Sequence, residues 1–276
     1  MVEFNQKLIC LLSDFGLRGQ HYVASMKAVI LKINPNVNII DLSHNITPYS
    51  VIEASYILRT TYKNFPKGTI FITVIDPGVG SSREILLLKT NSNYFFIGPN
   101  NGIFSGDLIN SVDECIEIKN EEYFNKPTSN TFHGRDIMAP IGAHLTTNIP
   151  LNVFGPKFNL NNLKEFKLTY NVDMKNKVIH CSIQYIDSFG NGTTNIALVN
   201  NNIQNSKFII DEGSEISVKI GKKIYNGFFT SHFSSAQINS LLFLVGSTGF
   251  LELSINQGNA SEILGFNVGD SIVLKL

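Results

Sequence analysis

An apolar run that ends on a carboxylate constrains this chain more than any other feature. Residues 70–75 read Ile-Phe-Ile-Thr-Val-Ile, and Asp76, Pro77 and Gly78 follow directly. A short β-branched run bounded by turn residues is typical of a buried strand in a parallel sheet. Because open α/β sheets bind ligands beyond the carboxyl ends of their strands, Asp76 is predicted to lie in a ligand site.

Two other polar segments also lie at an end of a predicted strand or helix. Residues 13–16 read Ser-Asp-Phe-Gly and come directly after the apolar run 8–12. Residues 131–136 read Thr-Phe-His-Gly-Arg-Asp and precede a helical pattern. The sequence therefore predicts an active site that is built from several loops.

Strand and helix patterns alternate through the first part of the chain. A capping box, Ser50-Val51-Ile52-Glu53, opens one of the predicted helices. The other predicted elements are strands at 8–12, 37–42, 70–75, 84–90 and 94–98 and helices at 22–33, 50–64 and 137–145. This order predicts an α/β domain over residues 1–160, with a mostly parallel sheet between helices on both faces.

The pattern changes beyond Pro156, where a linker is predicted over residues 156–175. Short alternating strands then dominate, at 178–185, 196–199, 208–210, 216–220, 241–245, 250–254 and 272–274. They predict an antiparallel all-β domain over residues 172–276, folded as a small barrel or sandwich.

Charge and composition limit the class of partner. The chain has 22 basic and 22 acidic residues and a net charge of +0, so electrostatics gives no reason to expect nucleic acid or an anionic membrane surface. A small-molecule ligand is favoured instead. Charged residues make up 16%, below the roughly 25% of typical soluble domains, which favours an oligomer that buries surface between subunits.

Cysteine and histidine spacing argues against a disulfide framework and a metal site. Cys10, Cys115 and Cys181 are odd in number and far apart, as expected for reduced core thiols. No metal is expected, since the histidines show no H-x-x-x-H spacing. The first seven residues lack a signal-peptide pattern and no apolar stretch reaches the ~18 residues of a membrane helix, so we expect a cytoplasmic protein.

The Asp-Phe-Gly triplet at Asp14 matches a kinase magnesium motif. No glycine-rich loop, strand lysine or catalytic loop precedes it, so the kinase interpretation fails. A carboxylate at the tip of a first strand can accept two hydrogen bonds from a ribose diol. The alternative is that Asp14 is the N-cap of the following helix.

The turn after Asp76 begins like a dinucleotide-binding fingerprint, with Gly78 and Gly80. Arg83 occupies the third glycine position and a strand follows, so phosphate binding is not expected. A tight turn here can fold Arg83 back onto Asp76 as a charge-assisted pair, with either a structural or a catalytic role. His133 can exchange protons near neutral pH, or can simply bond a loop carbonyl.

The second domain carries polar groups that suit a purine and an amino acid. Phe189 can stack on a purine, Asn191 can read its edge, and Asp187 can hold an ammonium group. The alternative is a glycine turn between two strands. A further cluster, which contains Ser247 and Asn256, offers polar groups to a planar ligand.

Taken in this order, the motifs resemble the S-adenosyl-L-methionine (SAM) hydroxide adenosyltransferase family, the hydrolase relatives of the SAM-dependent chlorinases and fluorinases. The resemblance runs from about Lys7 to Leu276. The segments that carry it are Asp-Pro-Gly-Val-Gly with Arg83, Phe-His-Gly-Arg-Asp at 132–136 and Asp-Ser-Phe-Gly-Asn at 187–191. The halogenase branch has a tyrosine in place of Asp76, so the chain resembles the branch that uses water.

The resemblance implies a catalytic triad of Asp76, Arg83 and His133. It further implies that Asp14 holds the ribose diol, Asp187 the methionine ammonium, and Phe189 with Asn191 the adenine. A homotrimer is implied, with each site between the N-terminal domain of one subunit and the C-terminal domain of its neighbour. SAM enters as the substrate, and no cofactor is implied.

One departure from the family and two alternative functions go with this interpretation. Gly19 and Gln20 stand where many members have an acidic residue five positions after the first aspartate. The expected reaction is attack of water on C5′ of SAM, which gives adenosine and L-methionine. The alternatives are a sensor that binds adenosine or SAM with negligible turnover, and a transferase that uses a halide.

Overall fold

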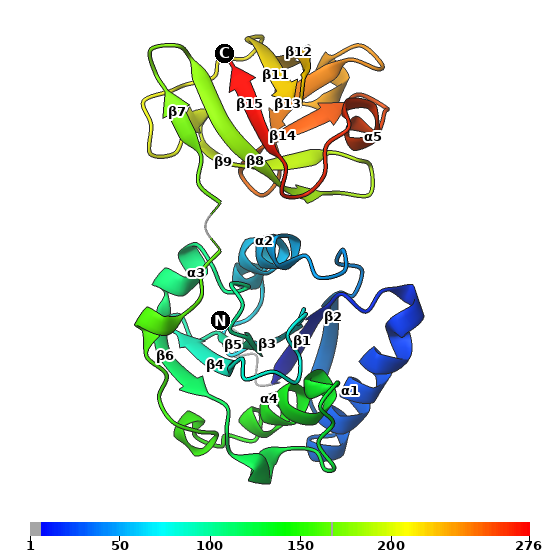
Figure 1. Cartoon of the computed structure of the whole chain (residues 1–276), viewed down its shortest axis with the longest axis vertical. Coiled ribbons are helices and arrows are strands. Elements are labelled where there is room, and N and C mark those ends of the chain that lie inside the picture. The colour runs from blue at the N-terminus through cyan, green and yellow to red at the C-terminus, as the bar shows by residue number, and fades with distance from the viewer. Residues whose placement is uncertain (1–6, 167) are drawn as a thin grey trace. The chain divides into compact units, whose positions relative to one another are not determined.

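The structure, a computed structural model, describes residues 7–166 and 168–276. The chain forms two compact units that divide between residues 167 and 168 (Figure 1). The expectation about a signal peptide concerns residues 1–6, which lie outside the described residues, as well as Lys7. Within the described ranges, no helix combines the length and apolar character needed to cross a membrane.

The described part of the first unit is built on a six-stranded sheet, in the order β2-β1-β3-β5-β4-β6. Neighbours among β2, β1, β3 and β5 are parallel, whereas β4 runs antiparallel to both β5 and β6. The mostly parallel sheet was predicted, and β4 and β5 lie at the strands predicted over 84–90 and 94–98. The strands are β1 (Leu8–Ser13), β2 (Asn38–Ser43), β3 (Ile70–Val74), β4 (Ile85–Thr90), β5 (Phe95–Pro99) and β6 (Val112–Glu117).

Two cores form from alternate residues of the same strands. Ile9 and Leu11 of β1 pack with α1 (Gln20–Ile33) and α4 (Ala139–Leu145). Leu8, Cys10 and Leu12 belong to the other core, with α2 (Val51–Thr61) and α3 (Asp107–Asn110). Figure 1 shows α2 and the pair α1 and α4 on either side of β1 and β3. A strand whose odd and even residues are both apolar is therefore buried on both sides, as the runs in the sequence predicted.

The predicted capping box is formed only in part. Ser50 Oγ accepts a hydrogen bond of 3.4 Å from the Glu53 N–H at the start of α2. The Glu53 carboxylate does not return to Ser50, because it accepts the N–H of Thr47 at 3.1 Å. Short 3₁₀ turns complete the connections, at Leu17–Gly19, Tyr62–Asn64, Glu121–Tyr123, Leu151–Val153, Leu160–Asn162 and Phe233–Ser235.

The second unit is a closed barrel, one of the two architectures predicted for it. A direct pairing of β8 with β9 closes the ring β9-β14-β13-β12-β11-β15-β8. β7, β10 and the short helix α5 (Ala260–Leu264) add to it. The strands are β7 (Asn171–Asp173), β8 (Val178–Ile186), β9 (Gly192–Val199), β10 (Asn202–Ile203), β11 (Glu215–Ile220), β12 (Lys223–Phe229), β13 (Leu241–Val245), β14 (Phe250–Ile255) and β15 (Ser271–Lys275).

Three details of the barrel differ from the sequence-based expectation. β12 and β13 are parallel, so the barrel is not wholly antiparallel. The predicted strand 208–210 is wrong, because Ile209 makes only an isolated bridge to Asn202. β12 was missed since two of its apolar residues, Ile224 and Phe228, are exposed while Phe229 is buried, so its apolar residues do not alternate with polar ones.

The cysteines are free and buried, as predicted. Burial raises the pKa of Cys10 and of Cys115 to about 12, and it also raises the pKa of Cys181. All three thiols are therefore protonated at neutral pH and behave as small apolar side chains.

Candidate active site

A small cavity of about 90 Å³ in the first unit collects residues from all three predicted segments. Asp14 follows β1, Asp76 follows β3, and His133 precedes the helix that leads into α4. β1 and β3 are parallel neighbours, so their carboxyl ends bring Asp14 and Asp76 to one edge of the sheet. The other lining residues are Phe15, Tyr49, Val74, Val79, Thr131, Phe132 and Gly134.

Arg83 folds back onto Asp76, as the turn predicted. Arg83 Nη2 donates to Asp76 Oδ2, and Nη1 donates to the Glu84 carbonyl at 2.9 Å. Asp76 Oδ1 accepts the Gly78 N–H at 3.1 Å, so both carboxylate oxygens have a donor. The two side chains of the pair are 9% and 4% exposed, which makes this a desolvated ion pair. Burial raises the pKa of Asp76, and the Arg83 charge opposes that rise.

A glycine is required within this turn. Gly80 has φ +80°, and a Cβ there would lie 2.5 Å from the Asn130 carbonyl oxygen. The turn that holds Arg83 therefore packs directly on the loop that leads to His133, because no side chain separates them.

His133 is not anchored to a loop carbonyl through Nδ1. That atom is buried and makes no hydrogen bond within the described residues. Burial lowers the pKa of His133, while the nearby Asp76 carboxylate acts in the opposite direction. The imidazole is therefore neutral at pH 7 and can accept a proton.

A π-helix, Gly134–Met138, holds His133 at the end of β3. A Cβ on Gly134 would lie 2.9 Å from Val74 Cγ1, so the absence of a side chain lets the helix approach the strand. Two hydrogen bonds of 2.7 Å join Arg135 to Asp136, which is fully buried, so this pair has a structural role. Asp136 also accepts the Ser129 N–H at 2.9 Å, which ties down the loop before His133.

Asp14 does not cap the following helix, so that alternative is wrong. The N-cap of α1 is Gly19, which makes no side-chain capping bond. Asp14 Oδ2 instead accepts the N–H of Tyr49 at 2.8 Å. A Cβ on Gly19 would lie 2.7 Å from Phe15 Cβ, so any side chain at position 19 would require Phe15 to move.

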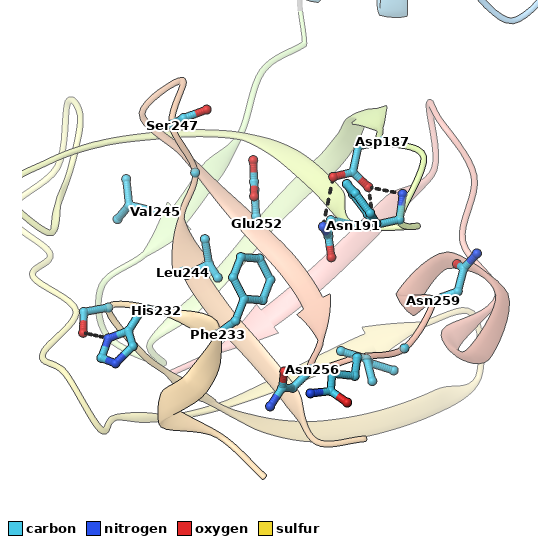
Figure 2. Close-up of a pocket in the computed structure, with 16 residues that line it drawn as sticks. Asp187, Asn191, His232, Phe233, Leu244, Val245, Ser247, Glu252, Asn256 and Asn259 are labelled. Atoms are coloured by element: carbon cyan, nitrogen blue, oxygen red, sulfur yellow. Dashed lines mark hydrogen bonds between the residues drawn. The ribbon is translucent and has the colours of Figure 1, made fainter. Parts of the chain in front are cut away.

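The second unit has its own, larger cavity of about 910 Å³. It contains all five residues predicted there: Asp187, Phe189, Asn191, Ser247 and Asn256. Figure 2 shows Asp187 and Asn191 beside each other, with Ser247 and Asn256 at separate parts of the lining. The described residues thus hold two groups of predicted site residues, one in each unit.

Asp187 organises the turn between β8 and β9. Its Oδ1 accepts the N–H groups of Phe189 and Asn191, each at 2.9 Å, and its Oδ2 accepts Asn191 Nδ2 at 2.9 Å. Gly190 completes the turn with φ +83°. The glycine-turn alternative is therefore correct as geometry, and the same turn leaves Phe189 75% exposed.

Sequence reasoning missed several residues that line the two cavities. Glu252, on β14, lies between Ser247 and Asp187 in Figure 2. Burial raises its pKa, and the charge of Asp187 raises it further, while Thr193 Oγ1 donates to it at 3.2 Å. A Cβ on Gly246 would lie 2.0 Å from Glu252 Oε1, so this glycine makes room for the carboxyl group. A single acidic residue within the apolar segment 250–255 was the available signal.

Tyr49 and Phe233 were also missed. Tyr49 is 70% exposed, has φ +67°, and lines the cavity of the first unit. Phe233 begins a 3₁₀ turn and lines the cavity of the second unit. Both are aromatic residues outside the regular helices and strands, where no periodic pattern marks them.

Comparison with known proteins identifies the family. Residues 9–155 match the SAM hydroxide adenosyltransferase N-terminal domain, and residues 181–273 match the C-terminal domain of the same family. An (R)-S-adenosyl-L-methionine hydrolase of Methanocaldococcus jannaschii is 34% identical over 280 residues, which cover 96% of this chain and 94% of the relative. A fluorinase of Nocardia brasiliensis is 23% identical, with 98% and 97% covered.

Solved structures agree with this result. A crystal structure of an uncharacterized conserved protein from Thermotoga maritima has a TM-score of 0.86 and 34% identity, and covers 97% of this chain and 100% of that one. A conserved hypothetical protein from Thermus thermophilus has a TM-score of 0.74 and 26% identity, with 98% and 100% covered. The two matched domains and their motifs show that the chain belongs to the SAM hydroxide adenosyltransferase family.

Proposed function

We propose that this protein is a SAM hydrolase, which uses water to convert SAM into adenosine and L-methionine. The observation that carries the proposal is the buried Asp76–Arg83 pair, which shares one small cavity with Asp14 and with a His133 of lowered pKa. Relatives named (R)-S-adenosyl-L-methionine hydrolase, at 26–34% identity over nearly the whole chain, support it.

Each predicted residue has a role in this proposal. Asp14 keeps Oδ1 for the ribose diol, since Oδ2 is bonded to the Tyr49 N–H. In the second unit, exposed Phe189 stacks on adenine and Asn191 reads its edge, while Asp187 holds the methionine ammonium. Ser247 and Asn256 supply further polar contacts.

The proposed step is an in-line displacement at C5′. The oxygen of water forms a bond to C5′ as the bond from C5′ to sulfur breaks, and the electron pair of that bond goes to sulfur. The positive charge of the sulfonium disappears, so a site that excludes water favours the transition state over the bound substrate. Asp76, oriented by Arg83, and His133 align the water, and His133 accepts its proton.

We also propose a homotrimer. Each site is completed by the N-terminal domain of one protomer and the C-terminal domain of its neighbour. The low share of charged residues, 16%, supports burial of surface between subunits. Leu17 and Tyr49 of the first unit are 79% and 70% exposed, as expected of apolar side chains that a partner covers. SAM is the substrate, with no added cofactor, and three unpaired cysteines fit a cytoplasmic location.

The test is incubation of the purified protein with SAM, followed by chromatography for adenosine and methionine. Equal amounts of both products are expected, and they should be lost in Asp76→Ala. Asp113→Ala, at an exposed position on β6, is the matched control and should retain activity. Adenosine that binds tightly without turnover of SAM would instead indicate a sensor.

A chloride-containing sample addresses the likeness to fluorinases. No 5′-chloro-5′-deoxyadenosine is expected, because the Asp76 carboxylate repels a halide in this cavity. Formation of that product at a rate comparable with that of adenosine would contradict the hydrolase proposal.

A further inference from the structure

A line of polar side chains runs from the surface residues Lys27 and Asp41 to the buried residue before Asp14. Ser13 Oγ lies 2.7 Å from His44 Nδ1, and His44 Nε2 lies 3.0 Å from Asp41 Oδ1. Asp41 Oδ2 is in turn 2.5 Å from Lys27 Nζ on α1. Ser13 is 1% and His44 8% exposed, so the imidazole lies away from solvent. None of the proposed catalytic steps uses it.

The segment that contains His44 also holds the loop 13–16 by its backbone. The Gly16 N–H donates to the His44 carbonyl at 2.7 Å, and the Tyr49 N–H donates to Asp14 Oδ2 at 2.8 Å. His44 therefore bonds the loop on both sides of Asp14: its side chain contacts Ser13, and its carbonyl accepts the Gly16 N–H.

The contacts also indicate which imidazole nitrogen carries the proton. A carboxylate can only accept, so in a neutral ring the proton belongs on Nε2, which faces Asp41, and Nδ1 then accepts the hydroxyl proton of Ser13. Nδ1 bonds Ser13 and Nε2 faces the Asp41 carboxylate, so both sides of the ring have a neighbour that favours one orientation. Such a fixed ring can hold a neighbouring side chain to the sub-ångström tolerance that a binding site needs.

We infer that His44 is a positioning residue for Asp14, and that it sets the affinity for the ribose of the substrate through its bond to Ser13. This inference rests on the proposed role of Asp14 in binding the ribose diol. It concerns binding and not the chemical step, because Asp76, Arg83 and His133 lie on other segments.

Two substitutions separate the two ends of the imidazole. His44→Asn places an amide atom near the position of Nδ1 and so keeps a partner for Ser13. His44→Gln reaches the position of Nε2 and keeps the contact to Asp41 but not the one to Ser13. Calorimetry with adenosine should show affinity about tenfold weaker in His44→Gln, which is about 1.4 kcal/mol, and within about threefold of the starting protein in His44→Asn.

Ser13→Ala removes the hydroxyl alone and should match His44→Gln. When SAM turnover is measured over a range of SAM concentrations, kcat should change less than KM in both variants, since the reacting groups are untouched. His180→Gln, at an exposed position on β8, is the control and should change neither value. Melting temperatures measured for every variant show which of them retain the fold.

A double-mutant cycle distinguishes positioning from a general structural effect. If His44 acts through Asp14, His44→Gln should cause no further loss of adenosine affinity in an Asp14→Ala background. The inference is overturned if His44→Gln and Ser13→Ala bind adenosine as the unchanged protein does, or if His44→Gln costs as much with Asp14 as without it. Failure of the unchanged protein to bind adenosine or to turn over SAM refutes the proposed function, a result that no His44 variant can produce.

Discussion

Asp76 carries a buried charge that depends on one partner. Arg83 supplies the guanidinium, and both side chains are almost fully buried. Removal of one member of a buried pair leaves an uncompensated charge, which typically costs about 3–5 kcal/mol. The pair therefore contributes to folding as well as to the proposed chemistry.

Arg83→Ala should lower the free energy of unfolding by about 3 kcal/mol or more and move the acid limb of kcat to higher pH. Arg83 lowers the pKa values of both Asp76 and His133, so its loss should raise both. Urea unfolding and the dependence of kcat on pH measure the two effects. Arg18→Ala, at an exposed position, should show neither effect, and an unchanged acid limb in Arg83→Ala would contradict the electrostatic effect of Arg83 on Asp76 and His133.

His133→Ala should slow kcat by about 10²–10⁴-fold, the usual contribution of a general base, with little change in SAM affinity. Burial lowers the pKa of His133 below 6.5, so the neutral base is present at pH 7 and is lost as the pH falls through that lowered pKa. Activity should therefore hold through neutral pH and decline on the acid side. Equal losses of kcat and of affinity would exclude this role.

The sequence predicted site residues at the ends of strands and at the start of a helix. Asp14, Asp76 and His133 follow a strand or precede a helix, next to glycines, so their convergence could be foreseen. Glu252 had only a weak signal, a single acidic residue in an apolar segment, because alternate residues on one face of a strand usually meet water and a carboxylate there is ordinary. His44 was weighed only as a metal ligand, and its bond to Ser13 depends on how β1 and β2 pair.

At the scale of the element, the π-helix fixes how near His133 comes to β3. Gly134→Ala should destabilise the protein by about 1–3 kcal/mol, the usual cost of overpacking, and should also reduce kcat. The added Cβ would lie 2.9 Å from Val74 Cγ1, so the helix must shift, and His133 with it. Thermal unfolding and SAM turnover test both effects.

Val74→Ala supplies the matched partner for that test. The smaller side chain removes the obstructing methyl groups, so the double variant should recover part of the stability that Gly134→Ala loses. Strictly additive losses would show that the contact with Val74 is not the cause.

Element types were predictable where the apolar period was clear, as in β1, β3 and α1. β6 and β12 were not, for different reasons. β6 carries three acidic residues, Asp113, Glu114 and Glu117, which interrupt its apolar pattern. β12 turns Gly227 inward, where a Cβ would lie 2.5 Å from the Leu241 carbonyl oxygen, and turns the apolar residues Ile224 and Phe228 outward. Such features follow from the closure of the barrel, which local sequence does not encode.

At the scale of the whole molecule, two groups of site residues lie in two separate units. If the proposed sites are shared between protomers, inactive chains should complement each other. Asp76→Ala and Asn191→Ala, coexpressed in equal amounts, should form mixed trimers in which roughly a quarter of the sites are intact. Each variant alone should be inactive.

SAM turnover by the purified mixed oligomer, with its mass from light scattering, is the measurement. A verified mixed oligomer without activity would show that one chain supplies every residue of a site. A monomeric mass for the unchanged protein would refute the trimer directly.

The position of β15 has a consequence for how the protein is made. β15 follows all other barrel strands in the sequence, yet it lies between β11 and β8. A ribosome therefore releases the first unit, with Asp76 and His133, long before the barrel can close. Until β15 emerges, β11 and β8 present unpaired edges that invite association with other nascent chains. The barrel, to which we assign the adenine and methionine contacts, is thus the last part to become safe from aggregation, and a chaperone would be most needed there.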